Sequence, residues 1–129
     1  MNSKFPRMED LDVWKECRKL RIELRKIAKS LPPEEKFRLV DQLTRACRSI
    51  TNNIAEGYGR FHYQENIQYL RQSRGSVCEC IDDLYVCFDE EYIDSKLFTE
   101  LYEQSQLCIR LINGYIKYLN NRKSGGNVK

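Results

Sequence analysis

The sequence has 129 residues, 32% of them charged and 41% hydrophobic, and a formal net charge of +3 at pH 7. A chain of this length fits one domain that buries roughly two-thirds of its unfolded surface. The sequence has no apolar run near the ~20 residues that span a bilayer and no basic-then-apolar N-terminal signal, which excludes a membrane-spanning helix and predicts a soluble, cytoplasmic protein.

The first predicted helix covers residues 12–30. Its apolar residues recur at steps of three and four, which places them on one face of a helix. These residues are Val13, Cys17, Leu20, Leu24, Ile27 and Leu31. Pro32 and Pro33 follow and end the helix, because a residue before proline avoids the α region.

Three further helices are predicted from the same periodicity. The second has Pro33 in its first turn, counts Phe37 on its apolar face and ends near Gly57. The third covers about 62–90, and the fourth runs from an Asp94–Ser95 cap to about 120. Gly75 and Gly114 interrupt the last two helices, which suggests close packing there.

Four helices joined by short turns predict an all-α fold, an antiparallel up-down-up-down four-helix bundle. The bundle domain is expected to cover residues 10–120, between a flexible N-terminal segment (1–9) and a polar, glycine-rich disordered tail (121–129).

Polar residues flank the apolar faces of the second and third helices at helical spacing. They are Gln42, Arg45, Ser49, Asn53, Glu56, Gln72, Ser76 and Glu79. If the two helices form a hairpin that turns near residue 60, Arg45 points towards Glu79 and Ser49 towards Gln72. We predict a partly buried structural network, because an unpaired buried polar group costs about 1–3 kcal/mol.

Catalytic, metal and cofactor sites are not predicted. The one histidine, His62, falls at a predicted turn, whereas a di-iron bundle needs Glu-x-x-His on two helices. Gly57-x-Gly59 follows a helix and lacks the third glycine of a dinucleotide loop, so one of these glycines is expected to cap the second helix with φ > 0. The six cysteines form no C-x-x-C pair and are expected as small, reduced core or boundary residues. The protein is therefore not expected to be an enzyme.

Charge is distributed unevenly along the chain. Residues 15–29 hold seven basic and two acidic residues, whereas residues 79–103 hold nine acidic residues and one lysine. The residues expected to contact nucleic acid are Lys15, Arg18, Lys19, Arg21, Arg25, Lys26, Lys29 and Arg60, and Arg38, Arg48 and Arg74 could add to this basic surface. One alternative is that these cations form a solvated face paired with the acidic residues of the fourth helix. Another is a protein-interaction scaffold, whose acidic end meets basic partners or neighbouring subunits through Asp89, Glu90, Glu91 and Asp94.

Two strings carry a resemblance to a known family: "NIAEGYGR" at 53–60 and "RGSVCE" at 74–79. With "LDVW" at 11–14, they resemble the bacterial 23S ribosomal RNA intervening-sequence proteins, also called the four helix bundle protein family. The similarity covers roughly residues 8–120. The sequence departs from the family's pattern at His62, where a serine is usual, and at Asn66, where an aromatic is usual.

The resemblance implies a four-helix protomer that assembles as a ring, with a homopentamer favoured. It also implies a relationship to the accessory variability proteins of retroelements, in which a basic ring surface binds nucleic acid and a reverse transcriptase. It implies no enzymatic activity and no cofactor.

Overall fold

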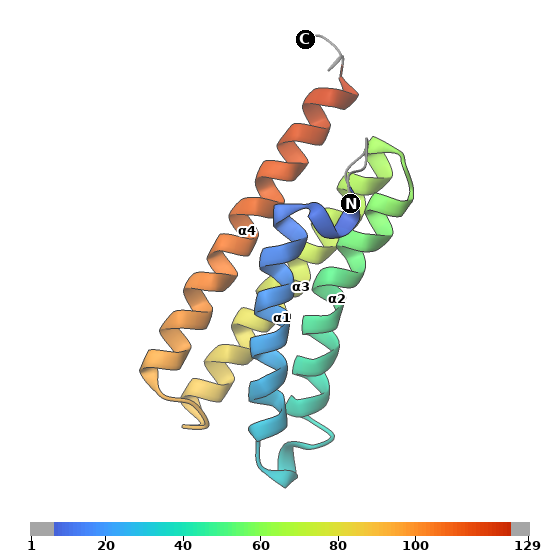
Figure 1. Ribbon diagram of the computed structural model, residues 1–129. Coiled ribbons are helices and arrows are strands. Elements are labelled where there is room, and N and C mark those ends of the chain that lie inside the picture. Colours follow the sequence, from blue (N-terminus) through green and yellow to red (C-terminus); the bar gives the residue numbers. More distant parts are fainter. Residues whose placement is uncertain (1–6, 125–129) are drawn as a thin grey trace.

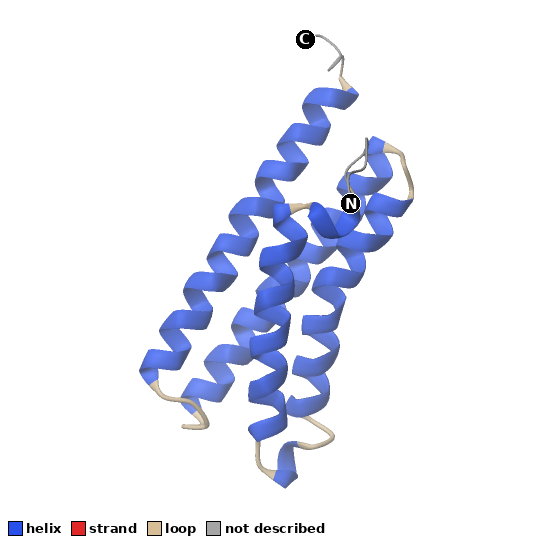
Figure 2. Cartoon of the chain, viewed as in Figure 1, coloured by secondary structure: helices blue, strands red, loops and turns tan. Residues whose placement is uncertain are grey.

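A computed structural model describes residues 7–124 of the chain. The described residues form helices and no strands (Figure 2), so the predicted all-α fold is confirmed. The four long helices are α1 (Asp12–Ser30), α2 (Leu39–Gly59), α3 (Tyr63–Asp89) and α4 (Ser95–Lys123). Two short 3₁₀ helices, η1 (Met8–Asp10) and η2 (Pro33–Glu35), precede α1 and α2.

Successive helices run in opposite directions and pack side by side (Figure 1). The hydrogen bonds between α1 and α2 fit an antiparallel pair, because the later residue of α1 bonds to the earlier residue of α2. Arg21 bonds to Thr51, and Arg25 bonds to Thr44. The turn between α2 and α3 and the C-terminal end of α4 therefore lie at the same end of the bundle (Figure 1).

The core consists of aliphatic side chains from all four helices, together with five cysteines. The largest fully buried side chains include Leu20, Leu24, Leu43, Ile50, Ile54, Ile67, Leu70, Leu84 and Ile112. Cys78 is exposed and the other five cysteines are buried as free thiols. The predicted apolar stripes thus supply the core. No helix within residues 7–124 has the length and apolarity to cross a membrane.

The start of α2 differs from the prediction. Pro33 opens the short helix η2, and Arg38 (φ −123°, ψ −99°) then leaves the helical region, so α2 begins at Leu39. The Leu39 amide donates to a carboxylate oxygen of Glu35 at 3.4 Å. Phe37 lies before this break and is 85% exposed, so its assignment to the core was wrong.

The turn between α2 and α3 also differs from the prediction. α2 continues through Gly57 and Gly59, and the residue with positive φ is Phe61 (φ 53°). Gly57 is needed for a different reason: a Cβ there would lie 2.8 Å from Oδ1 of Asn66 and 2.9 Å from Cβ of Tyr69. It marks a close approach of α2 to α3.

The expectation of close packing at Gly75 and Gly114 was wrong, since a Cβ at either position meets nothing within 4 Å.

The helical region extends further along the sequence than predicted, at both its N-terminal and its C-terminal side. α4 continues to Lys123, whose Nζ donates to Gln64 Oε1 at 2.6 Å, so residues 121–123 of the predicted disordered tail are helical. Met8 and Glu9, assigned to the flexible N-terminal segment, belong to η1. Residues 1–6 and 125–129 of those two segments lie outside the described part of the chain.

Candidate nucleic-acid interface

A groove of about 520 Å³ runs between α1 and α2, and we call it the basic groove. It is lined by Arg21, Ile22, Arg25, Lys26, Lys29, Cys47, Arg48, Thr51 and Asn52. Five of these residues are cationic and none is acidic. Arg21, Arg25 and Lys29 follow one another at steps of four, so the period of α1 turns them towards the same side.

Neutral hydroxyl groups of α2 position two of the arginines. Arg21 Nη1 donates to Thr51 Oγ1 at 2.9 Å, and Arg25 Nη1 donates to Thr44 Oγ1 at 3.4 Å. A threonine hydroxyl fixes a guanidinium without neutralising it, and the remaining N–H groups can bind an anion in the bidentate way that carboxylates and phosphates favour.

Most of the charge of the basic groove is uncompensated. Within residues 7–124, Lys26 pairs with Glu23 at 3.0 Å, whereas Arg21, Arg25, Lys29 and Arg48 form no ion pair. Five cations this close repel one another, so an anionic ligand would relieve unfavourable electrostatic energy as well as form hydrogen bonds.

Cys47 lies under the basic groove and is buried. Burial raises the pKa of its thiol, although Arg48, Arg21 and Arg25 oppose this shift. The thiol is therefore neutral at physiological pH and lacks the thiolate character of a nucleophile.

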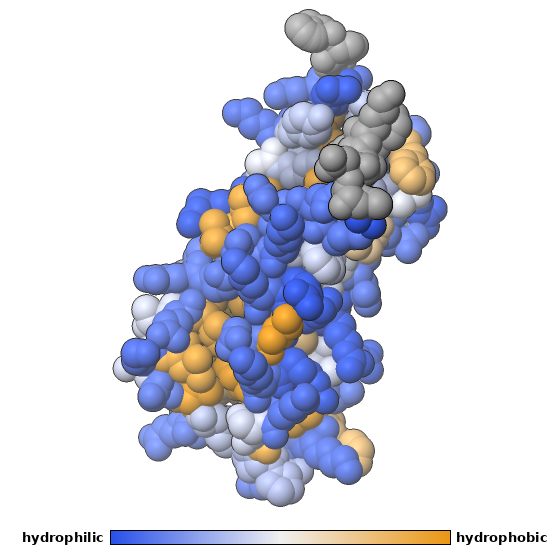
Figure 3. All heavy atoms as spheres, in the orientation of Figure 1, coloured by the Kyte–Doolittle hydropathy of each residue, from blue (hydrophilic) through white to orange (hydrophobic). Residues whose placement is uncertain are grey.

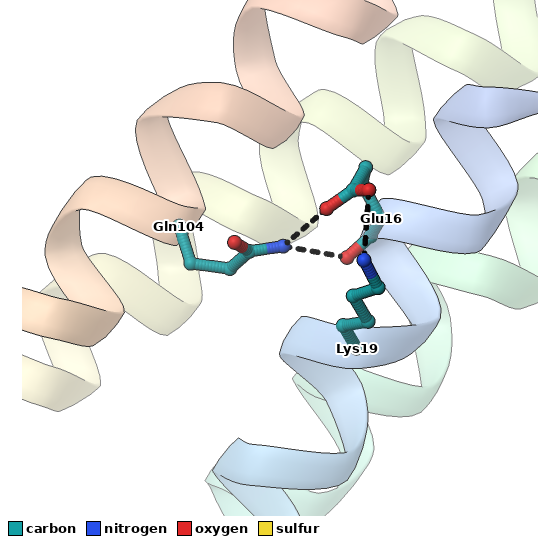
Figure 4. A network of polar contacts seen from close by, with 3 residues as sticks. All are labelled: Glu16, Lys19 and Gln104. Atoms are coloured by element: carbon teal, nitrogen blue, oxygen red, sulfur yellow. Dashed lines mark hydrogen bonds and ion pairs between the residues drawn. The ribbon is translucent and has the colours of Figure 1, made fainter.

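The other basic residues predicted to contact nucleic acid lie outside the basic groove and make different contacts. Lys19 Nζ pairs with Glu16 at 3.1 Å, and Glu16 accepts a hydrogen bond from Gln104 of α4 (Figure 4). Gln104 also donates to the Glu16 carbonyl at 2.9 Å. The hydrogen bonds that the Glu16 carboxylate accepts, from Gln104 first and from Lys19 second, lower the pKa of this carboxyl. Lys19 thus pairs with the residue that links α1 to α4 by hydrogen bonds.

Lys15, Arg18 and Arg60 also lie outside the lining of the basic groove. Lys15 is exposed, and the Arg18 guanidinium lies 5.9 Å from the ring centroid of Trp14. Arg60 pairs with Glu56 at 3.0 Å and donates to the Tyr69 hydroxyl at 2.8 Å. Arg60 thereby links the end of α2 to α3.

Sequence reasoning missed part of this site. Arg48 was expected only as an addition to the basic face, and Thr44 and Thr51 were not singled out. The available signal was the interval of seven between the two threonines, which places them on one side of α2.

The other flank of α2 carries the predicted polar network, which is only partly formed. The Oγ atoms of Ser49 and Ser76 lie 2.8 Å apart, Asn53 Nδ2 donates to the carbonyl and Oγ of Ser49 at 2.9 Å each, and Ser76 Oγ donates to the Gln72 carbonyl at 3.2 Å. The two serines therefore meet where Ser49 was expected to meet Gln72.

Arg45 does not reach Glu79. It pairs instead with Asp41, one turn earlier on α2, at 3.6 Å, because an i,i+4 partner lies closer than a residue on the next helix. The side chains of Gln42, Gln72 and Glu79 are exposed, and none of them forms a hydrogen bond in the network among the described residues. Glu56 pairs with Arg60.

This geometry predicts which pairs of substitutions interact. In a double-mutant cycle, Ser49→Ala and Ser76→Ala are expected to couple by about 0.5–1 kcal/mol, because their hydroxyls share a hydrogen bond. Arg45→Ala and Glu79→Ala are expected to add within about 0.5 kcal/mol. Urea denaturation of the single and double variants measures both terms, and a large Arg45–Glu79 coupling would contradict this arrangement.

An acidic groove of about 570 Å³ lies beside this network, between α2 and α3. It is lined by Asp41, Gln42, Arg45, Ala46, Ser49, Glu79, Asp82 and Asp83. Asp83 is buried, and burial together with the neighbouring Asp82 and Glu79 raises its pKa to about 6. Helix α2 therefore separates a basic groove from an acidic one.

The basic groove contains no acid–base pair that could carry out catalysis. Its lining includes no histidine and no carboxylate, and His62 lies at the start of α3, exposed. Within residues 7–124, no group of three or more histidine, cysteine, aspartate or glutamate residues is placed to hold a metal ion. The arrangement is suited to binding an anion.

Fold and groove define a class: an all-α four-helix bundle with an exposed cationic groove between its first two helices. Residues 9–114 match the protein family described as "23S rRNA-intervening sequence protein". Since this match covers most of the sequence, the chain belongs to that family.

A solved structure supports the fold. A protein of unknown function from the S23 ribosomal protein family of Bacteroides thetaiotaomicron VPI-5482 is similar with a TM-score of 0.75 and 23% identity, over 81% of this chain and 95% of that chain. At this identity the similarity concerns the fold alone. No functionally curated protein matched the sequence.

Proposed function

We propose that the protein is a non-catalytic, homo-oligomeric, nucleic-acid-binding protein of the cytoplasm, and that the basic groove binds the phosphates of a structured RNA or ribonucleoprotein. The observation that carries this proposal is the groove itself: five cations and no carboxylate, with Arg21 and Arg25 positioned by threonines. Figure 3 is consistent with a solvated surface there, since hydrophilic residues cover most of the face that α1 presents.

Binding of this kind depends on charge more than on sequence. Each phosphate neutralised by a lysine or arginine releases counterions, so affinity falls steeply as salt rises. RNA shape, or a protein partner such as a reverse transcriptase, then supplies the specificity.

Assembly as a homopentameric ring is part of the proposal. It is supported by the resemblance to the intervening-sequence proteins and by the two grooves of opposite charge on either side of α2. A ring would repeat the basic groove around its axis and multiply the phosphate contacts. Sedimentation at the mass of a single 15.4 kDa chain would contradict the assembly.

The test compares two triple variants with the same net charge. Changing Arg21, Arg25 and Arg48 to glutamine removes three groove cations, whereas changing Arg45, Arg71 and Arg110 to glutamine removes three arginines elsewhere. We expect the groove variant to bind a structured RNA at least ~10-fold more weakly at about 50 mM salt, and the slope of log affinity against log salt to fall by about 2. Fluorescence anisotropy at about 50 and 200 mM salt measures both quantities.

The control variant should retain most of the affinity. Absence of RNA binding by the unmodified protein at low salt would refute the proposal, as would equal losses in the two triple variants. Circular dichroism confirms that both variants fold.

The acidic groove favours a second candidate function, a protein-interaction scaffold or accessory subunit without direct nucleic-acid contact. Asp83, Asp82 and Glu79 would there receive basic side chains of a partner. A partner that remains bound after nuclease digestion, and is released by Glu79→Gln with Asp82→Asn, would support this function over the first.

A further inference from the structure

A further depression lies at the end of the bundle, where the α2–α3 turn approaches the C-terminal end of α4 (Figure 1). We call it the aromatic pocket. Its volume of about 670 Å³ falls in the range of small-ligand pockets. It is lined by Tyr58, Phe61, His62, Tyr63, Gln64, Asn66, Tyr115, Tyr118, Leu119 and Lys123.

Aromatic rings form half of this lining. The rings of Tyr115 and Tyr118 are stacked, with centroids 6.2 Å apart and planes at 18°, and Tyr118 is half exposed. Flat, partly exposed rings are platforms on which another flat ring can stack.

Phe61 is held at the mouth of the aromatic pocket in an unfavourable state. Its φ of 53° lies in the left-handed region, which bulky residues avoid, and its side chain is 88% exposed. Backbone strain of about 1–3 kcal/mol persists where the surrounding structure imposes it, and such residues cluster at binding sites. The turn therefore presents an apolar ring to solvent at an energetic cost.

Asn66 provides a polar group that lacks a partner. The residue is only 7% exposed, and within residues 7–124 its Oδ1 is buried without a hydrogen bond. Its Nδ2 lies 3.5 Å from the Tyr115 hydroxyl, at the limit of a hydrogen bond. Asn66 lines the aromatic pocket, but its Oδ1 packs against Gly57. The last torsion of an asparagine is broad, so rotation about it is the movement that would turn this amide towards a ligand.

Cations lie at the rim of the aromatic pocket. Lys123 lines it, and the Arg122 guanidinium lies 5.8 Å from the ring centroid of Tyr118. A ligand with a flat ring, a hydrogen-bonding edge and a negative charge matches the rings, the Asn66 amide and this rim. A nucleotide has all three features.

The two binding surfaces share one side of α2. Thr51 of the basic groove and Tyr58 of the aromatic pocket are seven residues apart, hence on the same side of the helix and roughly 10 Å apart along its axis. Only a few nucleotides are needed to cover this distance, since one strand advances about 3.4 Å per nucleotide.

We propose that the aromatic pocket binds one unstacked base of a single-stranded segment of nucleic acid, with Phe61 and Tyr118 stacking on the base and Asn66 bonding to its edge. This inference rests on the proposed nucleic-acid-binding function and adds to it the class of segment that is recognised.

The test measures the affinity for a single-stranded RNA of about 10 nucleotides and for an abasic strand of the same length. Base–aromatic stacking is worth about 1–3 kcal/mol per base, so Phe61→Ala and Tyr118→Ala are each expected to weaken binding of the RNA about 5- to 150-fold. Both substitutions should leave binding of the abasic strand unchanged. Tyr118→Phe keeps the ring and is expected to stay within about twofold of the unmodified protein.

Phe37→Ala is the matched control, because Phe37 is equally exposed (85%) but lies near η2, outside the lining of the aromatic pocket. It should leave both affinities unchanged. The proposal is overturned if the unmodified protein binds the RNA and the abasic strand equally well, which leaves phosphate binding by the basic groove intact. It is also overturned if Phe61→Ala changes the sedimentation mass and not the affinity, since the aromatic pocket is then a contact between subunits.

Discussion

Gly57→Ala is expected to destabilise the bundle by about 1–3 kcal/mol, the usual cost of overpacking a well-packed core. The new Cβ would lie 2.8 Å from Asn66 Oδ1, 2.9 Å from Tyr69 Cβ and 3.1 Å from the Asn66 carbonyl oxygen. Two of these three atoms are backbone or adjoin it, so α2 and α3 must separate to relieve the contact. The gain in helix propensity from alanine only partly offsets this cost.

Gly75→Ala is the control for that experiment. Gly75 lies inside α3 with open space around its Cβ position, so alanine there should stabilise the protein by about 0.5–1 kcal/mol. Urea denaturation followed by circular dichroism gives both free energies of unfolding. Equal effects at the two positions would show that the helices do not approach each other at Gly57.

Asp83→Asn is expected to stabilise the protein at pH 7–8 by about 1–3 kcal/mol. Burial and the nearby Asp82 and Glu79 raise the pKa of Asp83 from 3.8 to about 6 in the folded state. Between these two values the folded chain holds a proton that the unfolded chain has released. Stability therefore falls as pH rises through this window, and it stays low above it.

The gain from Asp83→Asn should consequently shrink as pH falls and disappear near pH 4. Thermal unfolding of both proteins from pH 4 to pH 8 tests this dependence. Asp82→Asn is the comparison. Asp82 is exposed, and its substitution removes only one of the neighbouring charges that raise the pKa of Asp83. A gain of the same size at every pH would contradict the assigned titration of Asp83.

The helices were predictable because their apolar residues recur with the helical period, and the family resemblance was carried by strings in α2 and α3. The turns were not predictable in the same way. Phe61 takes the left-handed conformation, although Gly59 stands only two positions earlier and could have taken it at no steric cost. Phe37 fits the apolar stripe of α2 yet lies before a break at Arg38. Both side chains are exposed, so the apolar period carries no signal for the change of backbone conformation at either position.

The candidate site was predictable only in its composition. The apolar face of α1 shows which side points inward, but the hand of the bundle decides whether Arg21 and Arg25 lie beside α2 or beside α4. The hand of the bundle cannot be inferred from the spacing of residues in the sequence. The partner of Arg45 was missed for a related reason, since Asp41 and Glu79 both lie at plausible spacings and only the folded arrangement selects Asp41.

The two grooves that flank α2 give the protein a lateral electric dipole, perpendicular to the helix axes. In the proposed binding of nucleic acid, such a dipole would turn the approaching polyanion towards the basic side before contact and repel it from the acidic side. Association rates would then fall with ionic strength, while dissociation would depend on the hydrogen bonds that the positioned arginines form. The arrangement of charge around a single helix would thus orient the encounter at a distance.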